Sequence, residues 1–477
     1  MHSRQICGCT ILLLFVSALA LSQTADKKQA PVSGSPEQKT AAHFESVRNQ
    51  PLLLEHFLRQ MPKGGDLHNH LPGAIYAESL VRYAVDNKLC VDRQTSALSA
   101  PPCDAAKGRP EAQVAWEDPM LYNQVLDAFS MRQFRPGRES GHDHFFATFL
   151  KFWPAMDGHT GEMLAEVASR SAANHLQYLE LIFNPDWGKA GQLGASMKWT
   201  DDFAAMRQQL LAAGLPQIVA EAGRQLDQAE AQERELLRCG HPQADPGCGV
   251  QVRYLYEVAR GLPKELVFAQ ILAGFEMASK DPRVVGLNLV MPEDWHVPVH
   301  DFNLHMRMLD YLHGVYPKVH ISLHAGELTK DLVPPEELFH IRESILRGHA
   351  ERIGHGVDVM QEQDPEALLR MMAKNKILVE ICLTSNDSIL GVSGMRHPLP
   401  VYLRHGVPVA LATDDAGVSR SDITQEYQRA AETYHLSYTD LKKMARASIA
   451  YSFLSAPDKT RMQSALEKAF GEFEKQF

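Results

Sequence analysis

The stretch Lys63-Gly64-Gly65-Asp66-Leu67-His68-Asn69-His70 predicts a β-strand that ends in two histidines. Side chains two residues apart on a strand point to the same face, so His68 and His70 can bind one metal ion together. Neutral imidazole nitrogen is a good zinc ligand. Asp66 shares this face and can orient a ligand histidine. A pair of surface histidines at a strand end is the competing interpretation, and the rest of the chain bears on that choice.

Strand-like apolar runs recur after this stretch, and helix-length segments separate most of them. They are Gln177–Phe183, Val252–Glu257, Val284–Val290, Val319–His324, Arg352–Val359, Ile377–Leu383 and Pro408–Thr413. Several are apolar at nearly every position, as expected when both faces of a sheet are covered. With the first strand they make eight strands, which predicts an α/β fold, a (β/α)8 TIM barrel. A doubly wound open sheet is the alternative.

The chain of 477 residues divides into a leader, a linker and one large domain. Residues 1–22 hold a weakly positive start, an apolar run and the small-residue cleavage signal Ala18-Leu19-Ala20, which predict a secretory signal peptide and a secreted or periplasmic protein. Residues 23–43 are polar and predict a flexible linker. Residues 44–477 are predicted to form the barrel, with an N-terminal helical extension and long insertions after strands 1 and 2. No membrane span is predicted, because the apolar run is too short for one.

The charge and the cysteines narrow the function classes. The net charge is −10 and no dense basic run is present, which argues against a nucleic-acid partner. In an oxidising compartment, Cys90 with Cys103 and Cys239 with Cys248 would each close a short loop. Cys382 lies in an apolar stretch and is expected to be a buried free thiol. Five unpaired cysteines are the alternative, because connectivity cannot be derived from sequence.

Reactive side chains gather where four of the predicted strands end. Strand 1 ends in His68 and His70, strand 5 in His324-Ala325-Gly326-Glu327, strand 6 carries Arg352-Ile353-Gly354-His355-Gly356, and strand 8 ends in Thr413-Asp414-Asp415. In barrel enzymes the chemistry sits at the carboxyl ends of the strands. Histidines and carboxylates at four such ends therefore predict an active site rather than a purely structural role.

The residue types in this set suit a metal site that activates water. Four of its side chains offer three nitrogen ligands and one oxygen, which suit zinc or another borderline metal and leave a position for water: His68, His70, His324 and Asp414. A bound metal lowers the pKa of water toward ~7. Glu327 is placed to exchange a proton with a substrate, and His355 can act as a base or hold a hydroxide. Asp415 points away from the metal position and can contact a substrate.

The motifs carry a resemblance to a known family. Met61-Pro62-Lys63-Gly64-Gly65-Asp66-Leu67-His68-Asn69-His70, His324-Ala325-Gly326-Glu327, Arg352-Ile353-Gly354-His355-Gly356 and Thr413-Asp414-Asp415 occur in this order. The sequence resembles the adenosine deaminase family of the amidohydrolase superfamily over roughly residues 44–450. The leader, the long first crossover and Ser385-Asn386 make it most similar to the secreted, growth-factor-type branch.

The resemblance implies a site and a reaction. One zinc ion per chain would be held by His68, His70, His324 and Asp414. The catalytic residues would be Glu327, His355 and Asp414, with Glu327 donating a proton to purine N1 and His355 assisting attack of zinc-activated water on C6. Asp415 would bind N7, and His70 and Met291 would also contact the substrate. The His-x-Glu and Pro-Cys-x-x-Cys signature of cytidine-type deaminases is absent from the sequence.

Three positions depart from the family pattern. Pro72 stands near the position where many members have an Asp that holds the ribose, and Glu293 or Asp294 are candidates to replace that carboxylate. Asn288 takes the place of an Asp. Met291 takes the place of a Gly whose backbone N–H meets purine N3, and its side chain is expected to crowd the approach.

The predicted activity is therefore zinc-dependent hydrolysis of adenosine, and of 2′-deoxyadenosine, to inosine plus ammonia. Because Pro72 carries no carboxylate, 5′-modified adenosines are expected to be processed as well. The alternatives are a related amidohydrolase acting on another aminopurine or on a different amide or ester, and a non-catalytic binding protein on the same fold. The expected partner is a small purine nucleoside, without nucleic acid or a membrane span. A homodimer is one option for the oligomeric state.

Overall fold

The computed structural model describes residues 34–137 and 139–477. Its main sheet consists of eight parallel strands: β1 (Gly64–His70), β4 (Leu176–Phe183), β5 (Gln251–Ala259), β6 (Val284–Val290), β7 (His320–Ala325), β8 (Arg352–His355), β9 (Leu378–Ile381) and β10 (Val409–Leu411). Each strand pairs with the next one along the chain, so all eight predicted strands are confirmed.

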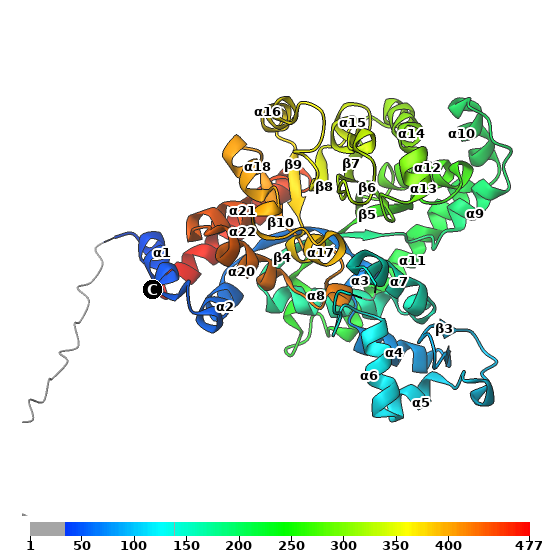
Figure 1. Cartoon of the computed structure of the whole chain (residues 1–477), viewed down its shortest axis with the longest axis horizontal. Helices are drawn as coiled ribbons and strands as arrows, with labels where there is room; N and C mark the ends of the chain where they lie inside the picture. The colour runs from blue at the N-terminus through cyan, green and yellow to red at the C-terminus, as the bar shows by residue number, and fades with distance from the viewer. Residues whose placement is uncertain (1–33, 138) are drawn as a thin grey trace, which may run out of the picture.

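The last strand returns to the first. A parallel bridge joins Asn69 to Asp414, with the His70 N–H donating to the Asp414 carbonyl over 3.2 Å and the Asp414 N–H donating to the His68 carbonyl over 2.8 Å. The sheet is thereby nearly closed into a (β/α)8 barrel, surrounded by helices (Figure 1). The open-sheet alternative is wrong, because an open sheet would leave β1 and β10 as free edges.

Helices fill the crossovers and cover the strands. After β5 the chain forms α12 (Lys264–Ala278), α13 (His296–His300), α14 (Phe302–Val315), α15 (His340–Leu346), α16 (Pro365–Asn375), α17 (Leu383–Leu390), α18 (Leu399–His405), α19 (Ala416–Ser419), α20 (Ile423–Tyr434), α21 (Tyr438–Ala450) and α22 (Ala456–Glu474). Helix α12 is buried on nearly all sides, because it packs on β5 and β6 and is covered by α14 and by two helices of an earlier crossover, α9 (Lys189–Ala195) and α11 (Leu215–Leu236). Its continuous apolar sequence follows from that position.

The two longest crossovers are the predicted insertions. Residues 71–175, between β1 and β4, hold α3 (Leu71–Ala74), α4 (Ala77–Asp86), β2 (Cys90–Val91), β3 (Leu98–Ser99), α5 (Ala112–Glu117), α6 (Pro119–Ala128), α7 (Gly141–Phe152) and α8 (Thr160–Ala173). Residues 184–250 hold α9 (Lys189–Ala195), α10 (Phe203–Ala212) and α11 (Leu215–Leu236). Helices α4, α5 and α6 lie together to one side of the barrel (Figure 1).

The cysteine prediction is confirmed. Cys90 and Cys103 form a disulfide in the first insertion, and Cys239 and Cys248 form a second one after α11. Among the described residues, Cys382 is a free thiol, and it is buried just after β9.

The predicted linker is wrong over part of its length. Two helices precede the barrel, α1 (Pro36–Val47) and α2 (Pro51–Gln60), and α1 begins inside the range assigned to the linker. Ser35 and Gln38 form a capping box, Pro36 occupies the first turn, and Phe44 is buried, so the helix has both a start signal and an apolar anchor. The predicted signal peptide and residues 23–33 lie outside the described residues. Within residues 34–137 and 139–477, no helix is long and apolar enough to cross a membrane.

Candidate active site

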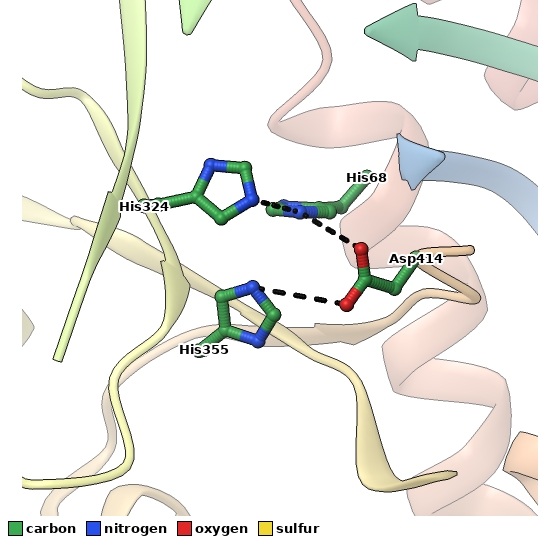
Figure 2. Close-up of side chains that lie close together, drawn as sticks. All are labelled: His68, His324, His355 and Asp414. Carbon is green, nitrogen blue, oxygen red and sulfur yellow. Dashed lines mark hydrogen bonds and ion pairs between the residues drawn. The ribbon is translucent and has the colours of Figure 1, made fainter. Parts of the chain in front are cut away.

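The predicted ligand side chains converge at the carboxyl end of the barrel. His68 and His70 come from β1, His324 comes from β7, and Asp414 follows β10. The Nε2 atom of His324 lies 3.1 Å from Nε2 of His68 and 3.1 Å from Nε2 of His70. Asp414 Oδ1 lies 3.3 Å from Nε2 of His70 and 3.7 Å from Nε2 of His68. Figure 2 shows His68, His324 and Asp414 around one point, with His355 beside them.

In two of these rings, the Nδ1 nitrogen contacts a hydrogen-bond acceptor outside the cluster. Nδ1 of His68 lies 2.7 Å from Glu380 Oε2, and Nδ1 of His324 lies 2.8 Å from Asn288 Oδ1. A proton on each Nδ1 satisfies both contacts, which leaves the two Nε2 lone pairs facing each other at 3.1 Å. Such an arrangement is repulsive unless a positive charge lies between the rings.

The charges around the rings also indicate a site for one positive charge. Burial lowers the pKa of His70 to about 3 and lowers that of His324 well below its usual range, so both rings are neutral. Burial also acts to lower the pKa of His68, but the hydrogen bond and the charge of Glu380 outweigh it and raise that pKa. The cluster thus accommodates one positive charge, which a proton or a metal cation can supply. Neutral imidazoles and a carboxylate are the donor set that a zinc ion takes.

The residue that orients His68 is Glu380, which the sequence analysis missed. Glu380 lies in β9 and is fully buried. Its Oε1 accepts from Arg352 Nε over 2.7 Å and from Ser322 Oγ over 2.9 Å. Asp66, predicted to orient a histidine, instead binds the segment just after β10: its Oδ2 accepts from Thr413 Oγ1 over 2.6 Å. That prediction is therefore wrong, and Asp66 contributes to barrel closure.

A glycine makes room for His68. A Cβ on Gly354 would lie 2.6 Å from Cε1 of His68, which is closer than real Cβ contacts. The glycine that precedes His355 in the Arg-Ile-Gly-His-Gly motif is therefore required by the neighbouring ring.

His355 is held by a chain of hydrogen bonds from behind. The side-chain amide of Asn386 donates to Nδ1 of His355 over 3.0 Å, and Nε2 of His397 donates to Oδ1 of Asn386 over 3.1 Å. The backbone N–H of Leu399 donates to Nδ1 of His397 over 3.1 Å. The Leu399 N–H makes Nδ1 of His397 an acceptor, so Nε2 of His397 carries the proton and donates to Asn386. Asn386 therefore turns its NH2 group toward Nδ1 of His355, and His355 carries its proton on Nε2. That nitrogen faces Asp414 Oδ2 at 3.9 Å.

Glu327 is positioned by a second carboxylate. Glu293 accepts from the backbone N–H of Gly326 over 3.1 Å and from that of Glu327 over 2.9 Å, and it also binds His340 Nδ1 at 2.5 Å. Burial and the neighbouring charge of Asp414 raise the pKa of Glu327 well above its usual range. Glu327 is therefore a protonated acid, and its Oε1 lies 3.6 Å from Nδ1 of His355.

Neither candidate for the missing ribose carboxylate is free. Both oxygens of Glu293 bind the turn before Glu327, and Asp294 Oδ1 lies 2.9 Å from Nε2 of His142. Neither residue lines the active-site cavity, so the structure gives no support to the suggestion that Glu293 or Asp294 replaces the carboxylate missing near Pro72.

Asp415 lies against Gly73. A Cβ on Gly73 would lie 1.6 Å from Asp415 Oδ1, so that glycine is needed for the carboxyl to reach its position. Burial and the charge of Asp414 raise the pKa of Asp415 well above its usual range, and its Oδ1 has no hydrogen-bond partner among the described residues. Asp415 thus presents one unpaired oxygen, and its raised pKa favours the protonated carboxyl. Asp414 itself accepts a hydrogen bond from Ser385 Oγ over 2.6 Å.

Met291 keeps the backbone conformation of a glycine. Its φ is +83°, in the left-handed region that L residues rarely adopt. Its side chain lies against Gly261, with Cε 2.9 Å from the place of a Cβ on that glycine. The crowding expected from this side chain is therefore partly relieved, although Met291 still lines the pocket.

A cavity of about 320 Å³ joins these residues into one site. Its polar side is formed by His70, His324, Glu327, Asp414 and Asp415. The rest of its lining is mainly apolar and includes aromatic residues of α7. His68 and His355 do not line the cavity and are fully buried. The volume lies at the lower end of the range for small-ligand sites and suits a nucleoside.

The family is decided by a match over most of the chain. A model named adenosine deaminase matches residues 159–469. The chain belongs to the adenosine deaminase family. This agrees with the prediction of a deaminase-type enzyme. The adenosine deaminase of Escherichia coli (strain SE11) is 36% identical over 145 residues, which are 30% of this chain and 40% of that protein. The chain thus matches less than half the length of this curated relative.

Solved structures share the fold at lower identity. The N6-methyl-AMP deaminase of Arabidopsis thaliana has a TM-score of 0.57 and 22% identity, over 88% of this chain and 99% of that one. An amidohydrolase of Burkholderia ambifaria with bound Zn has a TM-score of 0.55 and 17% identity, over 89% of this chain and 94% of that one. At these identities the similarity concerns the fold.

Proposed function

We propose that this member of the adenosine deaminase family is a zinc-dependent aminohydrolase that converts adenosine, and 2′-deoxyadenosine, to inosine and ammonia. The observation that carries the proposal is the pair of Nε2 atoms of His68 and His324, which lie 3.1 Å apart in the same site as Glu327, whose pKa is raised well above its usual range. A cation site next to a buried acid at the floor of a nucleoside-sized cavity is what hydrolytic deamination of a purine requires.

The metal would be held by four side chains: His68, His70, His324 and Asp414. Zinc bound there would lower the pKa of a water molecule and so supply a nucleophile at neutral pH. His355 is close enough to be a further ligand. The hydrogen bond from Asn386, however, places the His355 proton on Nε2, which removes the lone pair that a ligand needs.

That proton also determines the role of His355. Nε2–H can donate a hydrogen bond to the oxygen of the attacking water, so His355 orients this oxygen rather than acting as the base. Asp414 can accept a hydrogen bond from the same water through Oδ2, which faces His355. The sequence analysis allowed two functions for His355, acting as a base or holding a hydroxide. The hydrogen bonds of His355 support the second function.

The remaining residues act on the base. Glu327 donates its proton to N1, which makes C6 electrophilic, and the oxygen of water adds to C6. The C6–N6 bond then breaks and ammonia leaves. Of the two protons of the water, one replaces the proton that Glu327 gave to N1 and the other goes to the departing amine. Protonated Asp415 can donate to the lone pair of N7, and the Met291 backbone N–H can donate to N3.

The same proposal includes export of the protein from the cytoplasm. Residues 1–22 have the pattern of a signal peptide, and the two disulfides suit an oxidising compartment. Together they support assignment to the secreted, growth-factor-type branch of the family.

One assay tests the reaction. The purified protein is loaded with zinc and followed by ultraviolet absorbance against adenosine, 2′-deoxyadenosine, adenine, AMP and N6-methyl-AMP. We expect conversion of adenosine and 2′-deoxyadenosine to their inosine products with release of ammonia. Turnover confined to adenine or to a nucleotide would favour the alternative of a related amidohydrolase, and absence of turnover on the whole panel would contradict the proposal.

A further inference from the structure

A second cavity of about 290 Å³ lies beside the active-site cavity. Five residues line both: Pro72, Trp153, Glu257, Ala259 and Leu262. The remaining walls of the second cavity come mainly from the chain after β4 and from the start of α12. The two cavities are therefore neighbours across a shared wall, and no residue of the metal cluster lines the second one.

The orientation of a purine determines which part of a nucleoside approaches this wall. In the proposed reaction, C6 and N1 lie against His324, Glu327 and Asp414. The ribose is attached to N9, on the opposite side of the purine from N1. It therefore points away from the metal cluster. The wall shared by the two cavities, which includes Pro72 and Glu257, contains none of the four proposed ligands. With the ribose at this wall, a group on the 5′ carbon would extend past Pro72 and Glu257.

Glu257 stands at this boundary without a partner. It lies near the end of β5, and among the described residues no hydrogen bond or ion pair to its carboxyl is found. Glu257 is part-buried, and burial raises the pKa of its carboxyl to about 8. This favours the neutral acid, which can both donate to and accept from a hydroxyl group. It is a candidate contact for a ribose hydroxyl, since Pro72 offers none.

The chemistry of the second cavity is apolar and lacks cations. Its walls include Trp153, Phe183 and Trp187, whose rings contact one another at centroid distances of 6.1 and 5.6 Å. No Lys or Arg lines either cavity in the described part of the chain. Trp153, which lines both cavities, is 45% exposed, so a large apolar side chain of this wall is open to solvent. A phosphate would enter this space without a counter-charge, whereas an apolar group would gain contacts.

We propose that the second cavity is the subsite for the substituent on the 5′ carbon of the substrate, and that it takes uncharged apolar groups, such as an alkylthio group, and excludes phosphate. The inference rests on the proposed function and specifies its substrate class: 5′-modified adenine nucleosides in addition to adenosine, but not nucleotides.

The first test compares kcat/KM of the zinc-loaded enzyme for adenosine, 5′-methylthioadenosine and AMP. We expect 5′-methylthioadenosine to be used at least as well as adenosine, and AMP to be used roughly a hundredfold less well, because its phosphate would be buried unpaired. Rejection of 5′-methylthioadenosine, or use of AMP on a par with adenosine, would overturn the subsite.

A cavity-filling variant tests the location. Leu266 lines the second cavity and not the first, so Leu266→Trp should lower kcat/KM for 5′-methylthioadenosine about tenfold and leave that for adenosine nearly unchanged. Leu236→Trp is the matched control, because Leu236 is 49% exposed and lines neither cavity. An equal loss for both substrates in Leu266→Trp would place the 5′ group elsewhere.

A charge-adding variant tests the exclusion of phosphate. Gln192 lines the second cavity and is exposed, so Gln192→Lys should be tolerated. It should raise the kcat/KM for AMP relative to adenosine by about fivefold, the gain of one solvent-exposed ion pair. An unchanged ratio would mean that the phosphate does not reach this cavity.

Calorimetric titration separates this inference from the proposed function. If the enzyme deaminates no nucleoside, the proposed function fails, yet binding of 5′-methylthioadenosine to the parent protein and its loss in Leu266→Trp would still support the subsite. If adenosine is deaminated and 5′-methylthioadenosine neither binds nor reacts, the inference fails alone.

Discussion

The side-chain amide of Asn386 donates to Nδ1 of His355 over 3.0 Å, and this contact decides which ring nitrogen of His355 carries the proton. Asn386 is in turn fixed by His397, which donates to its Oδ1. Neither Asn386 nor His397 lines the active-site cavity. In the proposed reaction they would act through the tautomer of His355.

Replacing Asn386 by Asp should reverse that tautomer. A carboxylate at this position accepts from Nδ1–H of His355, so Nε2 loses its proton and cannot donate to the attacking oxygen. We expect kcat to fall on the order of 10²-fold with little change in KM, while metal content stays at the parent level. Steady-state kinetics and elemental analysis measure both. A parallel pair, His397→Ala and His397→Gln, should show loss and partial rescue, because Gln can still donate to Asn386.

Replacing His324 by Ala should abolish both the metal site and the activity. His324 lies within 3.1 Å of His68 and His70, so its removal takes away the central ligand. Elemental analysis of the parent protein should find about one zinc equivalent per chain, and the variant should hold almost none. His320→Ala is the matched control on the same strand, because His320 is exposed and pairs with Glu351. Full activity in a metal-free preparation of the parent would contradict the mechanism.

Replacing Glu327 by Gln should separate the acid from the metal. The side chain keeps its size and the backbone contact with Glu293, but it has no acidic proton to give to N1. We expect turnover to drop by about 10²–10⁴, with metal content and circular dichroism unchanged. Near-parent turnover would show that another group protonates the base.

Replacing Lys63 by Met should destabilise the fold without touching the site. The buried Lys63 ammonium donates to the carbonyls of Leu58, Met61 and Asn174 over 2.6, 2.9 and 3.0 Å. Met would leave these carbonyls unsatisfied, at a cost of about 2–4 kcal/mol. Thermal denaturation should show a lower Tm than for the parent, while Lys39→Met, at an exposed position on α1, should not. An unchanged Tm in Lys63→Met would mean that water takes over the three carbonyls.

The strands and the main site residues could be predicted because their signals are local. A strand buried on both faces is a run of apolar residues, and the proposed catalytic side chains follow such runs at their carboxyl ends. The start of α1 also has a local signal, the capping box of Ser35 and Gln38. The linker prediction gave more weight to the polar composition around it.

The residues that support the site could not be predicted in the same way. Glu380 sits inside β9, where its sequence neighbours give no sign that it reaches His68 of β1, which lies two strands away across the β10–β1 junction. Asn288 was noted only as a departure from the family pattern, yet its Oδ1 accepts from the backbone N–H of His324 and contacts Nδ1 of the same ring. His397 follows Asn386 by eleven residues, and only the folded chain brings them together. These contacts depend on tertiary structure alone.

The near-closure of the barrel joins the first strand to the last through very few backbone contacts, and the proposed ligands lie on both sides of that junction. His68 and Asp414 are separated by most of the chain, so a nascent polypeptide cannot assemble the ligand set before its last strand has been made. A metal ion bound there would cross-link β1 to the end of β10. Its removal should weaken the junction of these two strands before the rest of the barrel opens. Hydrogen–deuterium exchange after chelation should then be faster around Asn69 and Asp414 than at the β4–β5 pairing.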